Sequence, residues 1–465
     1  MLLILLNWFF IFITTYSIGY AGLSLLKIFT HNKSQPNLSP VLISLTGLSL
    51  ITTLANYFSL FAEIGQVFLV GLIIITFICI GFSLKSLMLP IRTINVKNIH
   101  SLVIIFGGGI FFIALLKAAG PTEIWDEGQY FLPLIRWIES NPTIPGSALF
   151  HDRMGYNSAF HMSSAVFGFS FWFKGGMYDL NAYLFIIINF YFLTGVNRIL
   201  KNKVKFSLHD YLMLFAGIAL YRQLLTSMDA DYPHIFIGIV LLLLFIEKAD
   251  EESLDLWDHK STAFLIIAAY LVTVKFLAVF YFLFIAALLI FQFQQKQWRI
   301  LWLSLGVGLS IFFPWLARNV IMTGYLVYPL HQFDFFQVDW KIPHEMAQNN
   351  YLYVGEHAKT LMERHTLYYE GASKVPVSVW LPQWWANHVT INLSALITAL
   401  IFPPSLLVLV SYLIVKGKKA FSDHELDLYC SRDSVSVTAC FPSSKKTTGI
   451  SGAFDPGLDR HGGPS

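Results

Sequence analysis

The stretch STAFLIIAAYLVTVKFLAVFYFLFIAALLIFQF, residues 261–293, carries a single charged side chain, Lys275. As one helix it would be about 50 Å long at a rise of about 1.5 Å per residue, whereas the hydrocarbon core of a bilayer is about 30 Å thick. Two shorter helices that meet near Lys275 therefore fit a membrane better. The segment must be helical in lipid, because its backbone has no water to bond with.

The composition of the whole chain supports the same environment. Of the 465 residues, 55% are hydrophobic and 13% are charged, against about 25% charged residues in a typical soluble domain. The formal charge of +3 is too small to indicate a nucleic-acid partner. The three cysteines give neither a disulfide framework nor a metal-binding spacing. The first apolar run starts at residue 2 without a basic region before it, which favours a retained helix over a signal peptide.

Apolar runs long enough to cross a bilayer recur along the chain. The predicted spans lie near residues 2–26, 38–60, 64–84, 99–117, 177–197, 207–222, 233–247, 261–274, 277–293, 300–317 and 389–415. Basic side chains collect on the cytoplasmic side of membrane proteins, and here they fall in alternate loops only if 261–293 forms two helices. The predicted fold class is therefore an all-α polytopic membrane protein with about 11 transmembrane helices, its N-terminus outside and its C-terminus inside.

This topology leaves two long outer-face loops, residues 118–176 and 318–388. The first contains the apolar pieces FLPLIRWIE and SAFHMSSAVFGFSFWF, which are typical of helices that lie in the membrane interface. The second is rich in Trp, Tyr and His and predicts a small cap without a large core.

The predicted organisation has five parts. They are N-terminal transmembrane helices (1–98), a membrane core with acidic outer loops (99–330), an outer-face cap (331–388), a transmembrane helix (389–415) and a cytoplasmic tail (416–465). The tail is rich in Ser, Gly, Asp and Pro. It is either disordered or a foreign or out-of-frame end that replaces further membrane helices.

Two acidic motifs fall in outer loops of this topology. Asp126 and Glu127 follow an apolar run in PTEIWDEGQYFLPLIRWIE, residues 121–139. They form either a solvated turn or helix start, or a general base that accepts a proton from an attacking hydroxyl. Asp229 and Asp231 lie in TSMDADYPHIF, residues 226–236. They form either a solvated turn or a site for a hydroxyl, a divalent cation or a sugar.

Two cations stand out in apolar surroundings. Lys275 costs about 2.5–3.5 kcal/mol at a helix centre on insertion scales, and such residues are usually functional, although a lysine near a helix end also snorkels to the interface. Arg318, in FFPWLARNVIMTGYLVYPL (residues 312–330), ends a predicted helix on the outer side. That side runs against the usual distribution of basic residues. Arg318 is therefore either an interfacial anchor or the partner of an anion such as phosphate.

The order and shared side of these motifs resemble the GT-C superfamily of membrane glycosyltransferases, in the branch of protein O-mannosyltransferases and aminoarabinose transferases. The resemblance covers roughly residues 100–330. It is carried by Asp126-Glu127 with Tyr130, HDRMGYNSAFHMSSAVFG, Asp229–Asp231, Lys275 and PWLARNVIMTGYLVYP. The chain departs from the family in having MGYNS (154–158) where a Lys-Pro-Pro run is usual, and in having three extra helices before the core.

The resemblance implies an enzyme of the plasma membrane (the bacterial inner membrane). The donor would be a polyprenyl-phosphate sugar, and a glycan, lipid or protein would be the acceptor on the outer face. Asp126 would be the base beside Glu127, Asp229 and Asp231 would bind the acceptor or a metal, and Lys275 and Arg318 would bind the donor phosphate. The metal requirement stays open, with a divalent cation as the candidate cofactor.

Two other classes of protein remain alternatives. A multi-pass transporter or flippase places its charges near the membrane midplane and often shows repeats, whereas here the acids lie at one surface and no repeat is visible. A cell-envelope glycan polymerase or ligase would depend on an Arg or His in an outer loop. The several histidines in residues 331–388 keep that alternative open.

Overall fold

A computed structural model of the chain describes residues 1–28, 38–93, 98–122, 126–201, 210, 227–249, 258–360 and 375–385. All of them belong to one compact unit, Met1–Ser411. These residues form helices, turns and loops, with no strand among them, which confirms the all-α class. The predicted spans at 207–222 (Asp210 apart) and 389–415 and the predicted tail at 416–465 lie outside the described residues.

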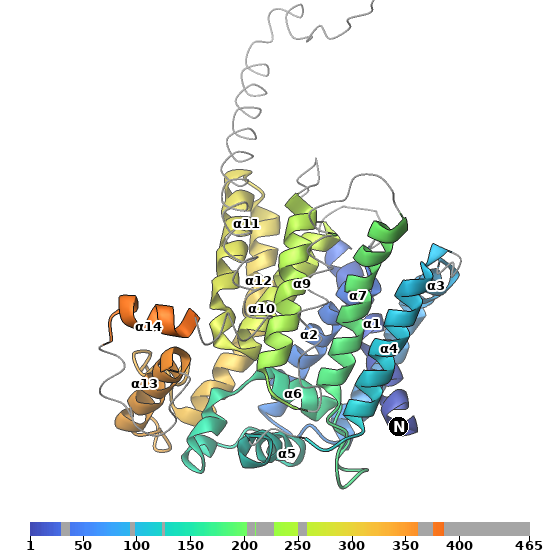
Figure 1. Cartoon of the computed structure of the whole chain (residues 1–465). Coiled ribbons are helices and arrows are strands. Elements are labelled where there is room, and N and C mark those ends of the chain that lie inside the picture. Colours follow the sequence, from blue (N-terminus) through green and yellow to red (C-terminus); the bar gives the residue numbers. More distant parts are fainter. Residues whose placement is uncertain are drawn as a thin grey trace, which may run out of the picture. The chain divides into compact units, whose positions relative to one another are not determined.

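The fold is built from long helices joined by shorter helical turns (Figure 1). The long helices are α1 (Leu2–Ile28), α2 (Pro40–Ser59), α3 (Gln66–Thr93), α4 (Ser101–Ala118), α7 (Leu180–Lys201), α9 (Asp231–Ala249), α10 (His259–Val274), α11 (Phe282–Gln294) and α12 (Trp298–Thr323). The shorter elements are the π-helix η2 (Glu127–Phe131), α5 (Leu132–Ser140), the 3₁₀ turns η3 (Ser147–Leu149), η4 (Asp152–Tyr156) and η5 (Phe276–Tyr281), and α6 (Ala159–Val166), α13 (His344–Thr360) and α14 (Val377–Trp384).

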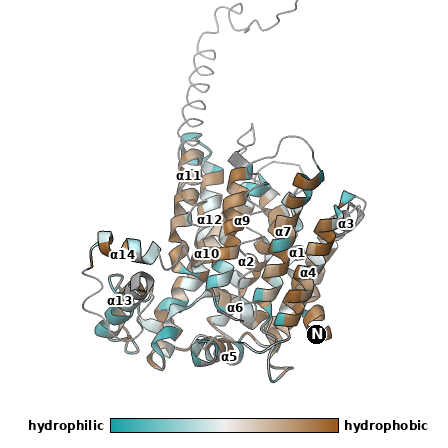
Figure 2. Cartoon of the chain, viewed as in Figure 1, coloured by the Kyte–Doolittle hydropathy of each residue, from teal (hydrophilic) through white to brown (hydrophobic). Residues whose placement is uncertain are grey.

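Several of these helices are suited to a membrane. Within the described residues, six are long and apolar enough to cross one: Leu2–Leu26, Pro40–Ser59, Ser101–Ala118, Leu180–Lys201, Phe276–Gln294 and Trp298–Thr323. Two shorter apolar helices, Gln66–Gly81 and His259–Val274, accompany them. Figure 2 shows apolar residues along most of the long helices. Large apolar side chains such as Ile105 and Phe112 of α4 are exposed, as expected for a surface that faces lipid. The apolar helices indicate a membrane protein.

The structure confirms the predicted break at Lys275. Helix α10 ends at Val274, and Lys275 has extended backbone angles (φ −148°, ψ 121°). The chain continues as the 3₁₀ turn η5 before α11 begins at Phe282. The residues 261–293 therefore do not form one continuous helix.

Helices α1 and α2 approach each other closely at two glycines. A Cβ atom on Gly47 would lie 1.7 Å from the carbonyl oxygen of Thr15, and one on Gly19 would lie 2.0 Å from that of Ile43. Small residues are typical of helix contacts in membranes, because they let backbones meet. Ser44 strengthens this contact, since its hydroxyl lies 2.5 Å from that of Thr15.

We expect Gly47→Ala to destabilise the protein. Alanine normally stabilises a helix by about 1 kcal/mol relative to glycine, but here α1 and α2 must separate to admit the methyl group. Overpacking of this kind typically costs about 1–3 kcal/mol. The matched control is Gly71→Ala in α3, where a Cβ would meet nothing within 4 Å. Thermal unfolding in detergent should show a lower melting temperature for Gly47→Ala alone, and equal melting temperatures would contradict the close contact.

The segment between α4 and α7 lies at the end of the long helices where α7 and α9 begin (Figure 1). Thr143 donates its backbone N–H to the carbonyl of Ser59, the last residue of α2 (2.7 Å). Ser158 donates its hydroxyl to the carbonyl of Val274, the last residue of α10 (2.6 Å). The predicted helix FLPLIRWIE is present as α5.

Two features of this end differ from the sequence-based expectation. Helix α6, predicted to lie in the membrane interface, has all eight residues buried and packs on α2 and α10. Seven of its eight side chains are small or apolar, which is typical of a buried helix, and His161 is the exception. Helix α12 does not end at Arg318 but runs to Thr323, where Gly324 takes a left-handed conformation (φ 80°) that terminates it.

Candidate functional site

The acidic pair occupies an unusual turn. Asp126 directly precedes the π-helix Glu127–Phe131, in which the N–H of Leu132 donates to the carbonyl of Glu127. Single π-turns are rare and are frequently found at functional sites. The two carboxylates have different partners, so the turn gives each of them a separate environment.

Asp126 lies in a partly exposed cluster with Tyr130 and Arg153. The hydroxyl of Tyr130 donates to Asp126 Oδ2 at 3.2 Å, and an Arg153 guanidinium nitrogen lies 3.5 Å from Asp126 Oδ1. The Asp126 side chain remains 40% exposed. The charge of the carboxylate is therefore partly balanced while one side stays open to solvent. A general base that takes a proton from a substrate hydroxyl needs such an open side.

Arg153 connects this cluster to helix α13. Its guanidinium carbon lies 5.3 Å from the ring centre of Tyr130 and 5.4 Å from that of Tyr353. Its Nη2 also donates to the hydroxyl of Tyr353, in α13, at 3.1 Å. A cation stacked on aromatic rings is held in place by their negative faces. Arg153 thus positions Asp126 against a helix that lies 200 residues further along the chain.

Glu127 points into the protein. It is 3% exposed, and its Oε2 accepts the backbone N–H of Met228 at 3.1 Å and the hydroxyl of Ser227 at 3.4 Å. Burial raises the pKa of Glu127 above its usual range, and these two hydrogen bonds oppose the rise. Glu127 joins the loop that carries the first acidic motif to the loop that carries the second.

The second motif begins α9. The backbone N–H of Asp231 donates to Asp229 Oδ1 at 2.8 Å, and the side chain of Asn181 donates to the carbonyls of Ser227 and Asp229. Burial raises the pKa of Asp229 to about 7, and the negative charges of Asp231 and Asp126 add to that rise. The two acidic motifs are therefore close enough for their charges to interact.

The raised pKa of Asp229 makes stability depend on pH. Its folded-state value of about 7 lies above the value of about 3.9 for an unfolded chain, so the folded state gains from the protonated form. That gain is present below pH 4 and is lost as the pH rises to about 7. We expect Asp229→Asn to raise the melting temperature at pH 8 by at least about 2 °C and to change it little at pH 4. The exposed Asp339→Asn is the control, and an equal effect at both pH values would contradict this shift.

Lys275 forms an ion pair with Asp231. The lysine is half-buried at the break between α10 and η5, where its side chain is 37% accessible. Its positive charge lowers the pKa of Asp229, against the rise that burial causes. The structure therefore brings Asp229, Asp231 and Lys275 together, with Asp126 nearby.

Arg318 lies elsewhere and has neutral partners. It is 3% exposed and donates to Asn157 Oδ1 (3.1 Å) and to the hydroxyls of Ser59 and Thr143 (both 2.7 Å). Within the described residues no ion pair joins it to a carboxylate, and no hydrogen bond joins it to the other five predicted site residues. Arg318 joins α12 to the end of α2 and to the loops around Thr143 and Asn157.

Asn157 holds this junction together from a left-handed backbone conformation (φ 43°, ψ 51°). Its side-chain amide donates to the carbonyl of Trp315 and to Asn319 Oδ1, both at 3.0 Å. Its own carbonyl accepts the indole N–H of Trp315 at 2.8 Å. Asn157 therefore holds the stretch that carries Arg153 against helix α12.

Sequence reasoning missed Arg153 as a site residue. It lies in HDRMGYNSAFH, which was predicted to be interfacial, and nothing local distinguishes it from an anchoring arginine. One signal was available in the sequence. Arg153 lies between Asp152 and MGYNS (154–158), the stretch that differs from the Lys-Pro-Pro run of the glycosyltransferases it resembles. Its partner Tyr353 gives no signal at all in sequence.

The described residues contain no group of three or more His, Cys, Asp or Glu side chains that could hold a metal ion. Asp231 is engaged with Lys275, and Asp229 accepts a backbone N–H. The metal requirement stays open, with a divalent cation as the candidate cofactor.

Comparison with known proteins gives a family. A family model described as "Domain of unknown function (DUF8201)" matches residues 1–440, and the chain belongs to that family. No curated protein and no solved structure matches the chain.

Proposed function

We propose that this chain is a membrane glycosyltransferase that moves a sugar from a polyprenyl-phosphate donor to an acceptor on the outer face of the plasma membrane, which in bacteria is the inner membrane. The supporting observation is the cluster at one end of the long helices. It combines the carboxylates of Asp126, Asp229 and Asp231 with the cations of Arg153 and Lys275. These residues come from four separate segments of the chain, so the fold is needed to assemble them.

The reaction that suits this cluster is a displacement at the anomeric carbon of the donor sugar. The acceptor hydroxyl passes its proton to Asp126, and its oxygen forms the new bond to that carbon. The bond from the carbon to the phosphate oxygen breaks, and the electron pair leaves with the polyprenyl phosphate. A positioned base typically contributes a factor of about 10²–10⁴ to such a reaction.

The cations would act on the leaving phosphate. Lys275 is partly exposed and paired with Asp231, so a donor phosphate can compete with that carboxylate for the ammonium. Fixed cations stabilise charge that develops in a transition state. Arg318 is enclosed by neutral partners, and a phosphate reaches it only if that enclosure opens. Lys275 is therefore the stronger candidate for the donor phosphate.

The proposal includes a topology in which about 11 helices cross the membrane and the acidic motifs face outside. Single cysteines at Asn141 and Gln348 would then react with an impermeant reagent added to intact cells, whereas one at Asn202 would not. Labelling of a cysteine at position 202 would mean that this position faces outside, and it would contradict the proposed topology.

The activity is tested with the purified full chain in proteoliposomes. Radiolabelled polyprenyl-phosphate sugars are supplied with total envelope glycans, lipids and peptides as acceptors, and label transferred to an acceptor is measured. Transfer that requires the chain supports the proposal. Movement of the donor across the bilayer without transfer would favour a flippase, and extension of a glycan on a lipid carrier would favour a polymerase or ligase.

A further inference from the structure

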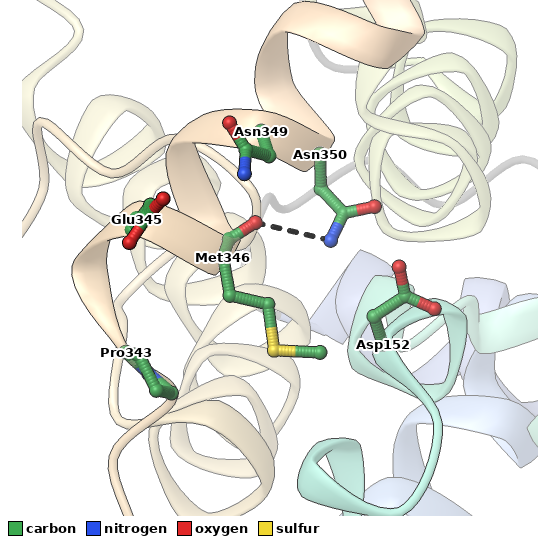
Figure 3. A pocket seen from close by; sticks show the side chains of 6 residues that line it. All are labelled: Asp152, Pro343, Glu345, Met346, Asn349 and Asn350. Atoms are coloured by element: carbon green, nitrogen blue, oxygen red, sulfur yellow. Dashed lines mark hydrogen bonds between the residues drawn. The ribbon is translucent and has the colours of Figure 1, made fainter.

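An open pocket of about 300 Å³ lies between the turn η4 and the helix α13 (Figure 3). It is lined by Asp152, Pro343, Glu345, Met346, Asn349 and Asn350. Asp152 comes from the segment before α6, and the other five residues come from α13 and the residue before it. Its volume is at the lower end of the range for small-molecule sites, about 300–1,000 Å³.

The lining combines polar side chains with the apolar side chains of Pro343 and Met346. Asn350 is only 8% exposed, and its amide nitrogen donates to the hydroxyl of Tyr328 (2.8 Å) and to the carbonyl of Met346 (3.1 Å). These bonds leave its amide oxygen without a hydrogen bond among the described residues. Figure 3 shows the side chain of Met346 between helix α13 and the segment that carries Asp152. A buried amide whose acceptor is unused favours a ligand that donates hydrogen bonds.

The remaining polar groups are also mainly acceptors. Glu345 and Asn349 are exposed and are four residues apart on α13, so they share one face of the helix. One carboxylate oxygen of Asp152 accepts the N–H of Arg153 at 2.8 Å, which leaves the other for a ligand. Two carboxylates and two amides suit the hydroxyl groups of a sugar, and the side chains of Pro343 and Met346 suit the C–H faces of its ring.

The pocket adjoins the acidic cluster. Asp152 directly precedes Arg153, which contacts Asp126 on one side and Tyr353 of α13 on the other. A ligand held against Asp152 is therefore one residue from the side chain that positions Asp126. We infer that this pocket binds one sugar ring of the acceptor, and that it selects an uncharged or amine-bearing ring over a carboxylated one. The acceptor role rests on the proposed function, whereas the sugar-binding role does not.

Binding is tested on the full chain in nanodiscs without any lipid donor. Saturation-transfer NMR is recorded with methyl glucoside, glucosamine and glucuronate, each in the millimolar range and in the presence of a calcium chelator. We expect signals from the first two sugars and a signal at least about tenfold weaker from glucuronate, because two carboxylates repel its charge. Equal signals from all three sugars, or none from any, would overturn the inference.

Variants of exposed residues separate recognition from folding. Asn349→Leu should abolish the signals from all three sugars, because it removes polar contacts at the mouth of the pocket. Glu345→Gln should strengthen the glucuronate signal several-fold, since it keeps the shape of the side chain and removes its charge. Asp339→Asn, in the same cap but outside the pocket lining, should change nothing. Signals that survive Asn349→Leu, or that Asp339→Asn alters equally, would assign the sugar to another surface.

The binding and transfer measurements fail separately. If the chain binds sugars in this pocket but transfers none, the proposed function is wrong and the sugar-binding site stands. If the chain transfers sugar and Asn349→Leu leaves the acceptor KM unchanged, the pocket is not the acceptor site. A signal that appears only when Ca²⁺ replaces the chelator would make the four oxygen-bearing side chains a cation site instead.

Discussion

Asp126→Asn is expected to leave a folded protein whose rate of sugar transfer is at least about a hundredfold lower. The amide keeps the size of the carboxylate and can still accept from the Tyr130 hydroxyl, which lies 3.2 Å away. It loses the ability to take a proton from the acceptor. It also leaves Arg153 without the carboxylate that lies 3.5 Å away. The measurement is transfer from a polyprenyl-phosphate sugar in proteoliposomes, with monodisperse elution as the folding check.

Two controls distinguish a base from a structural residue. Arg153→Lys keeps the positive charge but loses the planar group that stacks on Tyr130 and Tyr353, so it should reduce transfer less than Asp126→Asn does. Glu127→Gln should act mainly on folding, because Glu127 is buried against the loop at Met228. Full transfer by Asp126→Asn, with transfer lost in Asp229→Asn, would move the role of base to Asp229.

Lys275→Met should reduce transfer by about the same factor. The change removes the cation that pairs with Asp231 and that lowers the pKa of Asp229. The pKa of Asp229 should then rise above its value of about 7, and the pH at which transfer reaches half its maximum should move upward if Asp229 takes part. The measurement is the pH profile of transfer for the variant and the parent chain. Lys275→Arg should restore transfer only in part.

A double variant shows what the cation does. Asp231→Asn in the Lys275→Met background removes both charges, so it restores the balance of the pair without restoring a phosphate contact. If Lys275 serves only to balance Asp231, the double variant should recover most of the transfer. If Lys275 binds the donor phosphate, transfer should stay low and the KM for the donor should stay high. Normal transfer by Lys275→Met alone would leave the lysine as a snorkelling residue at a helix end.

The sequence predicted the helical class and the break at Lys275 because both depend on local properties. An apolar run of 33 residues with one central charge is too long for one crossing, and its charge marks where it is interrupted. The burial of α6 was missed, although seven of its eight residues are small or apolar, with His161 as the exception. The end of α12 was missed because Gly324 sets it, six residues beyond the arginine that looked like a boundary.

The candidate site was only partly readable. Acids that follow apolar runs are visible in the sequence, but their partners are not. Arg153 lies 27 residues from Asp126 and 200 residues from Tyr353, and only the folded chain brings the three side chains together. The neutral surroundings of Arg318 were equally hidden, because Ser59 and Thr143 reach it from other segments.

Position 157 should tolerate very few amino acids in a library that samples all twenty. The left-handed backbone at φ 43° is open mainly to glycine, asparagine and aspartate. Glycine supplies neither the amide that donates to Asn319 nor the oxygen that accepts from Arg318. Aspartate keeps the oxygen but cannot donate to the carbonyl of Trp315. A single side chain therefore meets every demand of the site, and relatives that fold in the same way are expected to retain it.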